Sequence, residues 1–101
     1  MPTPISPDRI RALGFEWPGA PKLAEAAVMT NGDVDLTATL ARVEADLAFY
    51  LREISAARMF SRTWDAPIDD VTDRMDEYVE GAAACRAALH HVRAIVAAIE
   101  V

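Results

Sequence analysis

Residues 60–75 read FSRTWDAPIDDVTDRM, and Pro67 inside this stretch divides two long apolar repeats. Asp33 can cap a helix, and from there to Ala66 the chain has neither glycine nor proline, so nothing interrupts that helix. Along it, apolar residues (with one serine among them) recur in alternating steps of four and three: Leu36, Leu40, Val43, Leu47, Tyr50, Ile54, Ala57, Ser61 and Trp64. This spacing is the heptad repeat of a helix that packs along a second helix.

The same repeat resumes after Pro67. Its positions are Ile68, Val71, Met75, Tyr78, Ala82, Cys85, Leu89, Val92, Val96 and Ile99. Asp65 is suited to cap a second helix that has Pro67 in its first turn. So short a connection allows only an antiparallel return. The sequence therefore predicts an all-α fold, a long coiled-coil-like helical hairpin over residues 33–101 with arms at about 34–64 and 66–100.

Antiparallel arms also predict a register, because facing positions keep a constant sum of residue numbers. Leu47 is expected opposite Cys85, which makes this thiol part of the core, and a rim ion pair is expected between Glu44 and Arg86. The other expected layers are Trp64–Ile68, Ser61–Val71, Ala57–Met75, Ile54–Tyr78, Tyr50–Ala82, Val43–Leu89, Leu40–Val92 and Leu36–Val96.

Residues 1–32 have a different character, since they hold five of the six prolines and three of the four glycines. They predict an N-terminal wrap with two short helices. The first is expected over residues 7–13 with Ser6 as its cap, and the second over residues 21–29, closed by Asn31-Gly32. Between them, residues 15–19 form an aromatic Trp/Pro/Gly loop whose rings are expected to pack onto the hairpin.

The hairpin has more apolar residues than its seam can bury. Those off the seam are Ala41, Ala45, Ala48, Phe49, Ala56, Met59, Phe60, Ala83, Ala84, Ala87, Ala88, Ala94, Ile95, Ala97, Ala98 and Val101. The N-terminal wrap is expected to cover one side, and a second copy is expected to cover the rest in a homodimer with a four-helix core. Phe49, Met59 and Ile95 mark the expected self-association surface.

The formal net charge of −6 is concentrated in one segment. Between Asp65 and Glu80 there are seven acids and one base, which give −7 + 1 = −6. Six of these acids fall on outward helix positions: Asp69, Asp70, Asp73, Asp76, Glu77 and Glu80. Three interpretations stay open: a solvated face, a docking face for a basic protein partner, and a site for a hard metal cation if other ligands complete it. Direct nucleic-acid binding is not expected, because no cluster of Lys and Arg is present.

Neither a catalytic nor a metal-binding constellation is expected, and no cofactor is predicted. His90 and His91 point about 100° apart on a helix, so they do not chelate one ion, and both are expected at the surface. The Glu-x-x-His motif of di-iron bundles is absent. The single cysteine excludes an intrachain disulfide. The acidic string from Asp69 to Asp73 is too short a motif to indicate an enzyme.

These features predict a non-catalytic protein–protein interaction module, accessory subunit or small regulatory protein. The alternative is a structural subunit of a larger assembly, such as a phage particle or a secretion apparatus. A third hypothesis is a small metal-binding bundle or a magnesium-dependent enzyme. A cytoplasmic location without a membrane span is expected, because residues 1–7 lack the pattern of a signal peptide and Arg86 and Arg93 interrupt the apolar stretch 81–101.

Overall fold

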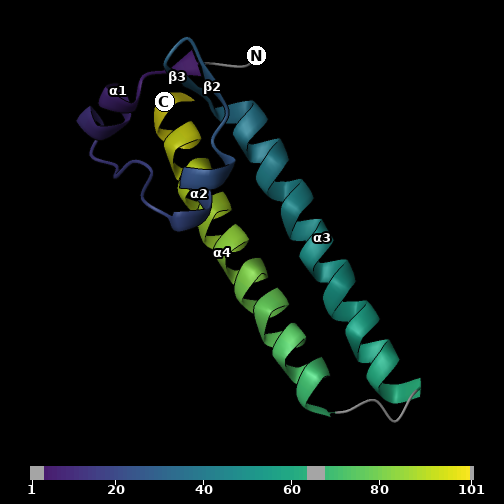
Figure 1. The fold of residues 1–101 in the computed structure, drawn as a ribbon. Helices are drawn as coiled ribbons and strands as arrows, with labels where there is room; N and C mark the ends of the chain where they lie inside the picture. The colour runs from purple at the N-terminus through teal and green to yellow at the C-terminus, as the bar shows by residue number, and fades with distance from the viewer. Residues whose placement is uncertain (1–3, 64–67, 101) are drawn as a thin grey trace.

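The computed structural model describes residues 4–63 and 68–100, with side chains described for residues 4–59 and 74–100. The described residues are mostly helical, and most of them lie in two long helices, α3 (Leu36–Thr63) and α4 (Ile68–Glu100). They pack against each other and run in opposite directions (Figure 1). The prediction of a mostly helical chain built on two long packed helices is confirmed.

The molecule is elongated. Its radius of gyration is 16.8 Å, with extents of 53, 24 and 23 Å, whereas a compact domain of this length has a radius of about 13 Å. The N-terminal elements gather around the end of the helix pair where α3 begins and α4 ends (Figure 1). The remaining length of α3 and α4 extends beyond them, so the cover that the N-terminal wrap provides reaches only part of the pair.

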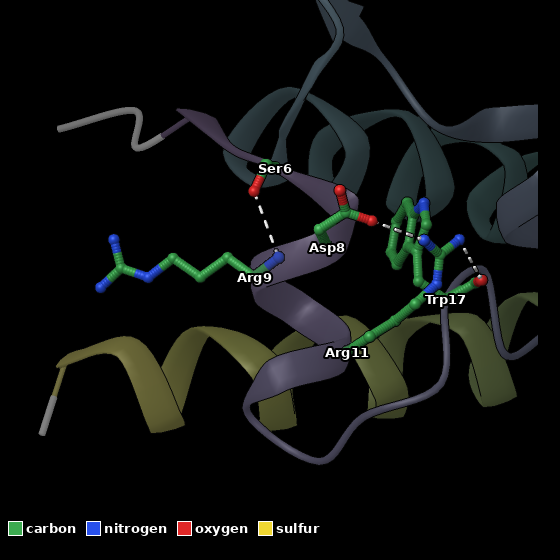
Figure 2. Close-up of polar contacts among 5 residues, drawn as sticks. All are labelled: Ser6, Asp8, Arg9, Arg11 and Trp17. Carbon is green, nitrogen blue, oxygen red and sulfur yellow. Dashed lines mark hydrogen bonds and ion pairs between the residues drawn. The ribbon is translucent and has the colours of Figure 1, made fainter.

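The first short helix, α1 (Pro7–Ala12), forms as the sequence predicts. The Ser6 hydroxyl accepts a hydrogen bond of 3.1 Å from the backbone N–H of Arg9, which is the expected N-cap. Figure 2 shows this cap and the Arg11 guanidinium, which donates to the carbonyl oxygen of Trp17 at 3.2 Å. Arg11 thereby holds the aromatic loop against α1.

The aromatic loop and the second short helix cover the core. Phe15 and Trp17 are half-buried and pack against the core, as expected. α2 (Pro21–Ala26) places Leu23 and Ala26 in the core, both almost completely buried. Residues 15–26 therefore provide much of the cover over the core at this end of the helix pair.

The prediction that the second helix continues to Met29 is wrong, because α2 ends at Ala26, and three short strands that the sequence did not predict accompany the helices. Three short strands form an antiparallel sheet in the order β1-β3-β2: β1 (Pro4–Ile5), β2 (Met29–Thr30) and β3 (Asp33–Asp35). Asn31 and Gly32 have φ angles of 54° and 86°, the conformation of a two-residue hairpin turn, and they join β2 to β3. An Asn-Gly pair that could close a helix closes a β-hairpin here.

The start of α3 also differs from expectation, because Asp35 and not Asp33 caps it. The backbone N–H of Ala38 donates to the Asp35 carboxylate at 2.9 Å, while Asp33 lies in β3 and pairs with Thr30. The Thr39 hydroxyl accepts from the N–H of Val28 at 3.0 Å and donates to the carbonyl of Asp35 at 2.7 Å. This buried threonine joins the sheet to the first turn of α3.

The core follows the predicted seam closely. Seven seam residues are buried: Leu36, Val43, Ile54, Ala82, Cys85, Leu89 and Val92. Eight more are half-buried: Leu40, Leu47, Tyr50, Ala57, Met75, Tyr78, Val96 and Ile99. The side chains of the remaining four lie outside the described residues: Ser61, Trp64, Ile68 and Val71. Two residues off the seam, Ala88 and Ile95, are also fully buried, in the same cluster as Leu23 of α2.

Tyr50 indicates how the two helices are aligned. Its ring lies 6.5 Å from the ring of Tyr78, centroid to centroid. A Cβ atom added to Gly81 would lie 2.5 Å from the same ring. Tyr50 is therefore level with residues 78–81 of α4, which agrees with the predicted Tyr50–Ala82 layer.

The predicted rim pair between Glu44 and Arg86 is wrong, because Glu44 pairs with Arg93 at 3.3 Å. The tilt of helical side chains explains the difference. Side chains lean toward the N-terminus of their own helix. In antiparallel helices, Glu44 therefore leans toward the end of the pair that holds the sheet, and Arg93 leans back toward Glu44. Arg86 also leans toward the N-terminus of α4, which takes it away from Glu44, and it is exposed.

Candidate functional site

Residues 69–80 of the acidic segment lie on the part of α4 that the N-terminal elements leave uncovered (Figure 1). Asp76, Glu77 and Glu80 are exposed, and no ion pair joins them to another residue in the described ranges. The other three predicted docking residues have side chains outside the described residues: Asp69, Asp70 and Asp73. The described acids thus form an unneutralised anionic patch on the surface.

The three residues of the predicted self-association surface are not all exposed. Phe49 and Met59 expose 47% and 67% of their surface. Ile95, by contrast, is fully buried in the core cluster that also holds Leu23 of α2. The sequence placed Ile95 off the seam, and the N-terminal segment, not a second copy, covers it. Leu51 and Val79 are also exposed, at 42% and 46%, and were not predicted.

A polar cluster that sequence reasoning missed joins α2 to the helix pair. Lys22 of α2 forms an ion pair with Asp46 of α3 at 2.9 Å, and its ammonium lies 5.8 Å from the centroid of the Tyr50 ring. The hydrogen bond to Asp46 raises the pKa of Lys22, with burial opposing the shift. Lys22 is the only lysine in the chain, and with its pKa raised it remains a cation at neutral pH. Lys22 therefore acts as a structural ion pair that clamps α2 to α3, and not as a nucleophilic amine.

Cys85 is fully buried beside this cluster, as the seam position predicts. Burial raises the pKa of its thiol; the nearby Lys22 charge acts in the opposite direction but does not outweigh it. A thiol with a raised pKa is protonated at neutral pH, and the thiolate is the nucleophilic form. The geometry therefore gives Cys85 a packing role.

His91 has a role that the sequence did not indicate. It is half-buried, and its Nε2–H donates to the backbone carbonyl of Glu16 at 2.7 Å. The ring also packs edge-to-face on Phe15, with centroids 6.1 Å apart. Gly19 passes so close that a Cβ atom there would lie 2.5 Å from Nε2. His91 thus holds the aromatic loop on α4, whereas His90 is exposed as predicted.

Within the described ranges, no three His, Cys, Asp or Glu side chains lie close enough together to hold a metal ion. The segment Arg74–Glu100 of α4 has the length and apolar composition of a membrane-spanning helix. Helices that pack in the core of soluble proteins share both properties, so neither property alone defines a membrane segment.

Comparison with known proteins finds no matching family, no similar curated protein and no similar solved structure.

Proposed function

We propose that this chain is a non-catalytic protein–protein interaction module that self-associates and binds a protein partner. The observation that carries the proposal is the exposed, unneutralised patch of Asp76, Glu77 and Glu80 on the uncovered part of α4. A rigid helix that presents several carboxylates suits a partner with a basic surface, because complementary charge speeds encounter and orients the partner. A cytoplasmic location is part of this proposal.

Exposed apolar residues on α3 and α4 support the same function. Large apolar side chains stand exposed beside the acids, namely Phe49, Leu51, Met59 and Val79. Aromatic and aliphatic residues of this kind supply the central contacts of protein interfaces, with charged groups at the rim. The heptad spacing of both long helices supports coiled-coil packing and a four-helix core in a homodimer.

The test is capture of partners from a lysate of the source cell by the immobilised chain. The variant Asp76→Asn/Glu77→Gln/Glu80→Gln should retain much less of the partner than the parent does. A matched control is Glu16→Gln/Glu25→Gln/Glu100→Gln, which also removes three exposed carboxylates but leaves the patch intact. The control should retain the partner as well as the parent does. Equal retention by all three proteins would refute the patch as a docking site.

A structural subunit of a larger assembly is the second candidate, and the elongated shape favours it. Repeated side-by-side packing of rods needs apolar long faces, which the exposed alanines of both helices supply. Sedimentation velocity distinguishes the two functions. An interaction module should form a closed small oligomer, whereas a structural subunit should grow into large species as its concentration rises.

A further inference from the structure

The side of the helix pair that faces away from the N-terminal segment has a specific pattern of residues. The ion pair between Glu44 and Arg93 lies on this side. Lys22 and Asp46 mark the opposite side, because Asp46 is two residues from Glu44 and so points about 200° around α3 from it. Similarly, the buried Ala88 is two residues from the exposed Arg86 of α4. We call the uncovered side the open face.

The open face is defined by two short rows of residues. On α3 the row is Glu44, Ala48, Leu51, Ser55 and Arg58, and on α4 it is Asp76, Val79, Ala83 and Arg86. Steps of three and four residues keep each row on one side of its helix. All nine residues are exposed. Ala48 and Ser55 flank Leu51, and Ala83 follows Val79. These small residues leave room for another helix to approach closely.

Each row is self-complementary. On α4 the acidic Asp76 and the basic Arg86 are equally far from residue 81, with Val79 and Ala83 placed symmetrically between them. On α3 the acidic Glu44 and the basic Arg58 are equally far from Leu51. If either helix packs antiparallel on its own copy about these midpoints, acid meets base at both ends and apolar residues meet in the middle.

The two midpoints lie at the same height along the molecule. The Tyr50 side chain contacts Tyr78 and lies against Gly81, so residue 51 of α3 is level with residue 81 of α4 to within a few residues. A single twofold axis can therefore run perpendicular to both helices, over both midpoints on the open face. Rotation about this axis places each row opposite its own copy. An interface of this kind is isologous, with every contact made twice.

We propose that a second copy of this chain docks on the open face about this axis, so that α3 packs on α3 and α4 on α4 of the second copy. This inference rests on the proposed function and names the self-association surface. Leu51 meets its own copy on the axis, Val79 packs on Ala83, and Asp76 pairs with Arg86. The face lies within extents of 53 and 24 Å, which is room for the roughly 800 Å² that one partner contributes to a standard interface.

The first experiment places a cysteine on the axis. Leu51→Cys should form a disulfide-linked dimer under mild oxidation, because the two copies of residue 51 meet there. Leu13→Cys is the matched control, since Leu13 is a leucine of equal exposure, 43% against 42%, and lies in the N-terminal segment. The control and the parent, whose Cys85 is buried, should stay unlinked. Failure of Leu51→Cys to cross-link faster than Leu13→Cys overturns the proposed axis.

The second experiment tests the charges by sedimentation velocity. The parent should sediment as a dimer of the 11.0 kDa chain. Asp76→Arg or Arg86→Asp alone should weaken the dimer about tenfold, because the axis repeats each lost pair, and the double swap should restore it. A monomeric parent, or a double swap as weak as the single ones, overturns the inference. A monomeric parent also removes self-association from the proposed function, whereas partner binding is decided separately, by the capture experiment with the acidic-patch variant.

Discussion

Thr39 is a small example of how single residues connect the two parts of this molecule. Its hydroxyl lies between the N–H of Val28 and the carbonyl of Asp35, and both hydrogen bonds form in a fully buried position. Lys22 and His91 make the corresponding connections to α3 and α4 from the other N-terminal elements. The N-terminal segment is thus held by a few polar contacts as well as by burial of apolar surface.

Replacing Thr39 by valine keeps the shape of the side chain and removes the hydroxyl. The N–H of Val28, a half-buried residue, then loses its acceptor, which costs about 1–3 kcal/mol of unfolding free energy. Urea denaturation followed by circular dichroism measures the loss. Thr37→Val, at an exposed position of the same helix turn, should change stability little. An equal effect of the two variants would show that the Thr39 hydrogen bonds do not stabilise the fold.

The clamp formed by Lys22 predicts a dependence of stability on pH. Its pKa in the folded state lies above 10.5, the ordinary value for a lysine, chiefly because of the hydrogen bond to Asp46. A raised pKa stabilises the fold fully below the unfolded value and loses that contribution as pH rises through the folded value. The parent should therefore be more stable than Lys22→Met at neutral pH, and this difference should shrink above pH 10.5. Denaturant titrations at neutral pH and above pH 10.5 measure the difference in unfolding free energy between the two proteins. A difference that stays constant would contradict the stabilising role of the Lys22–Asp46 pair.

At the scale of elements, the sequence predicts the long helices well and the short strands poorly. The heptad repeat extends through both helices, and a pattern repeated so often leaves little freedom in type or alignment. Strands of two and three residues show no periodicity, so only the Asn31-Gly32 pair could have indicated the hairpin. Ile95 was misplaced for a related reason, since periodicity does not say which side of a helix pair a distant segment will cover.

The alignment of the two long helices predicts the effect of a core truncation. Leu89 is 4% exposed and belongs to the central cluster. Leu89→Ala should lower the unfolding free energy by about 2–5 kcal/mol, because it removes buried methyl groups and leaves a cavity. Leu13→Ala, at an exposed position, should cost far less. Thermal unfolding of both variants measures the contrast, and a Leu89→Ala protein that melts with the parent would show that the alignment is incorrect.

At the scale of the whole molecule, the end of the helix pair that the N-terminal elements leave uncovered is also the end that carries most of the negative charge. One end of the helix pair is wrapped by the N-terminal elements, and ion pairs there join α2 to α3 and α3 to α4. The other end carries most of the net charge of −6. Self-repulsion is therefore concentrated where the N-terminal segment adds no stability. A surface of this kind is stabilised by a partner or by salt.

That repulsion can be measured directly through Glu77 and Glu80. Each has an acid four residues before it in α4, Asp73 and Asp76, and like charges at this spacing cost about 0.2–0.5 kcal/mol per pair. Glu77→Gln/Glu80→Gln should therefore raise the unfolding free energy by several tenths of a kcal/mol at low ionic strength. Salt screens exposed charges, so added sodium chloride should stabilise the parent more than the variant and close the gap between them. Glu16→Gln/Glu25→Gln, which removes two exposed carboxylates outside the long helices, is the control and should show neither effect. A variant that is less stable than the parent at low salt would mean that these carboxylates have favourable partners, and the acidic patch would then be part of the fold.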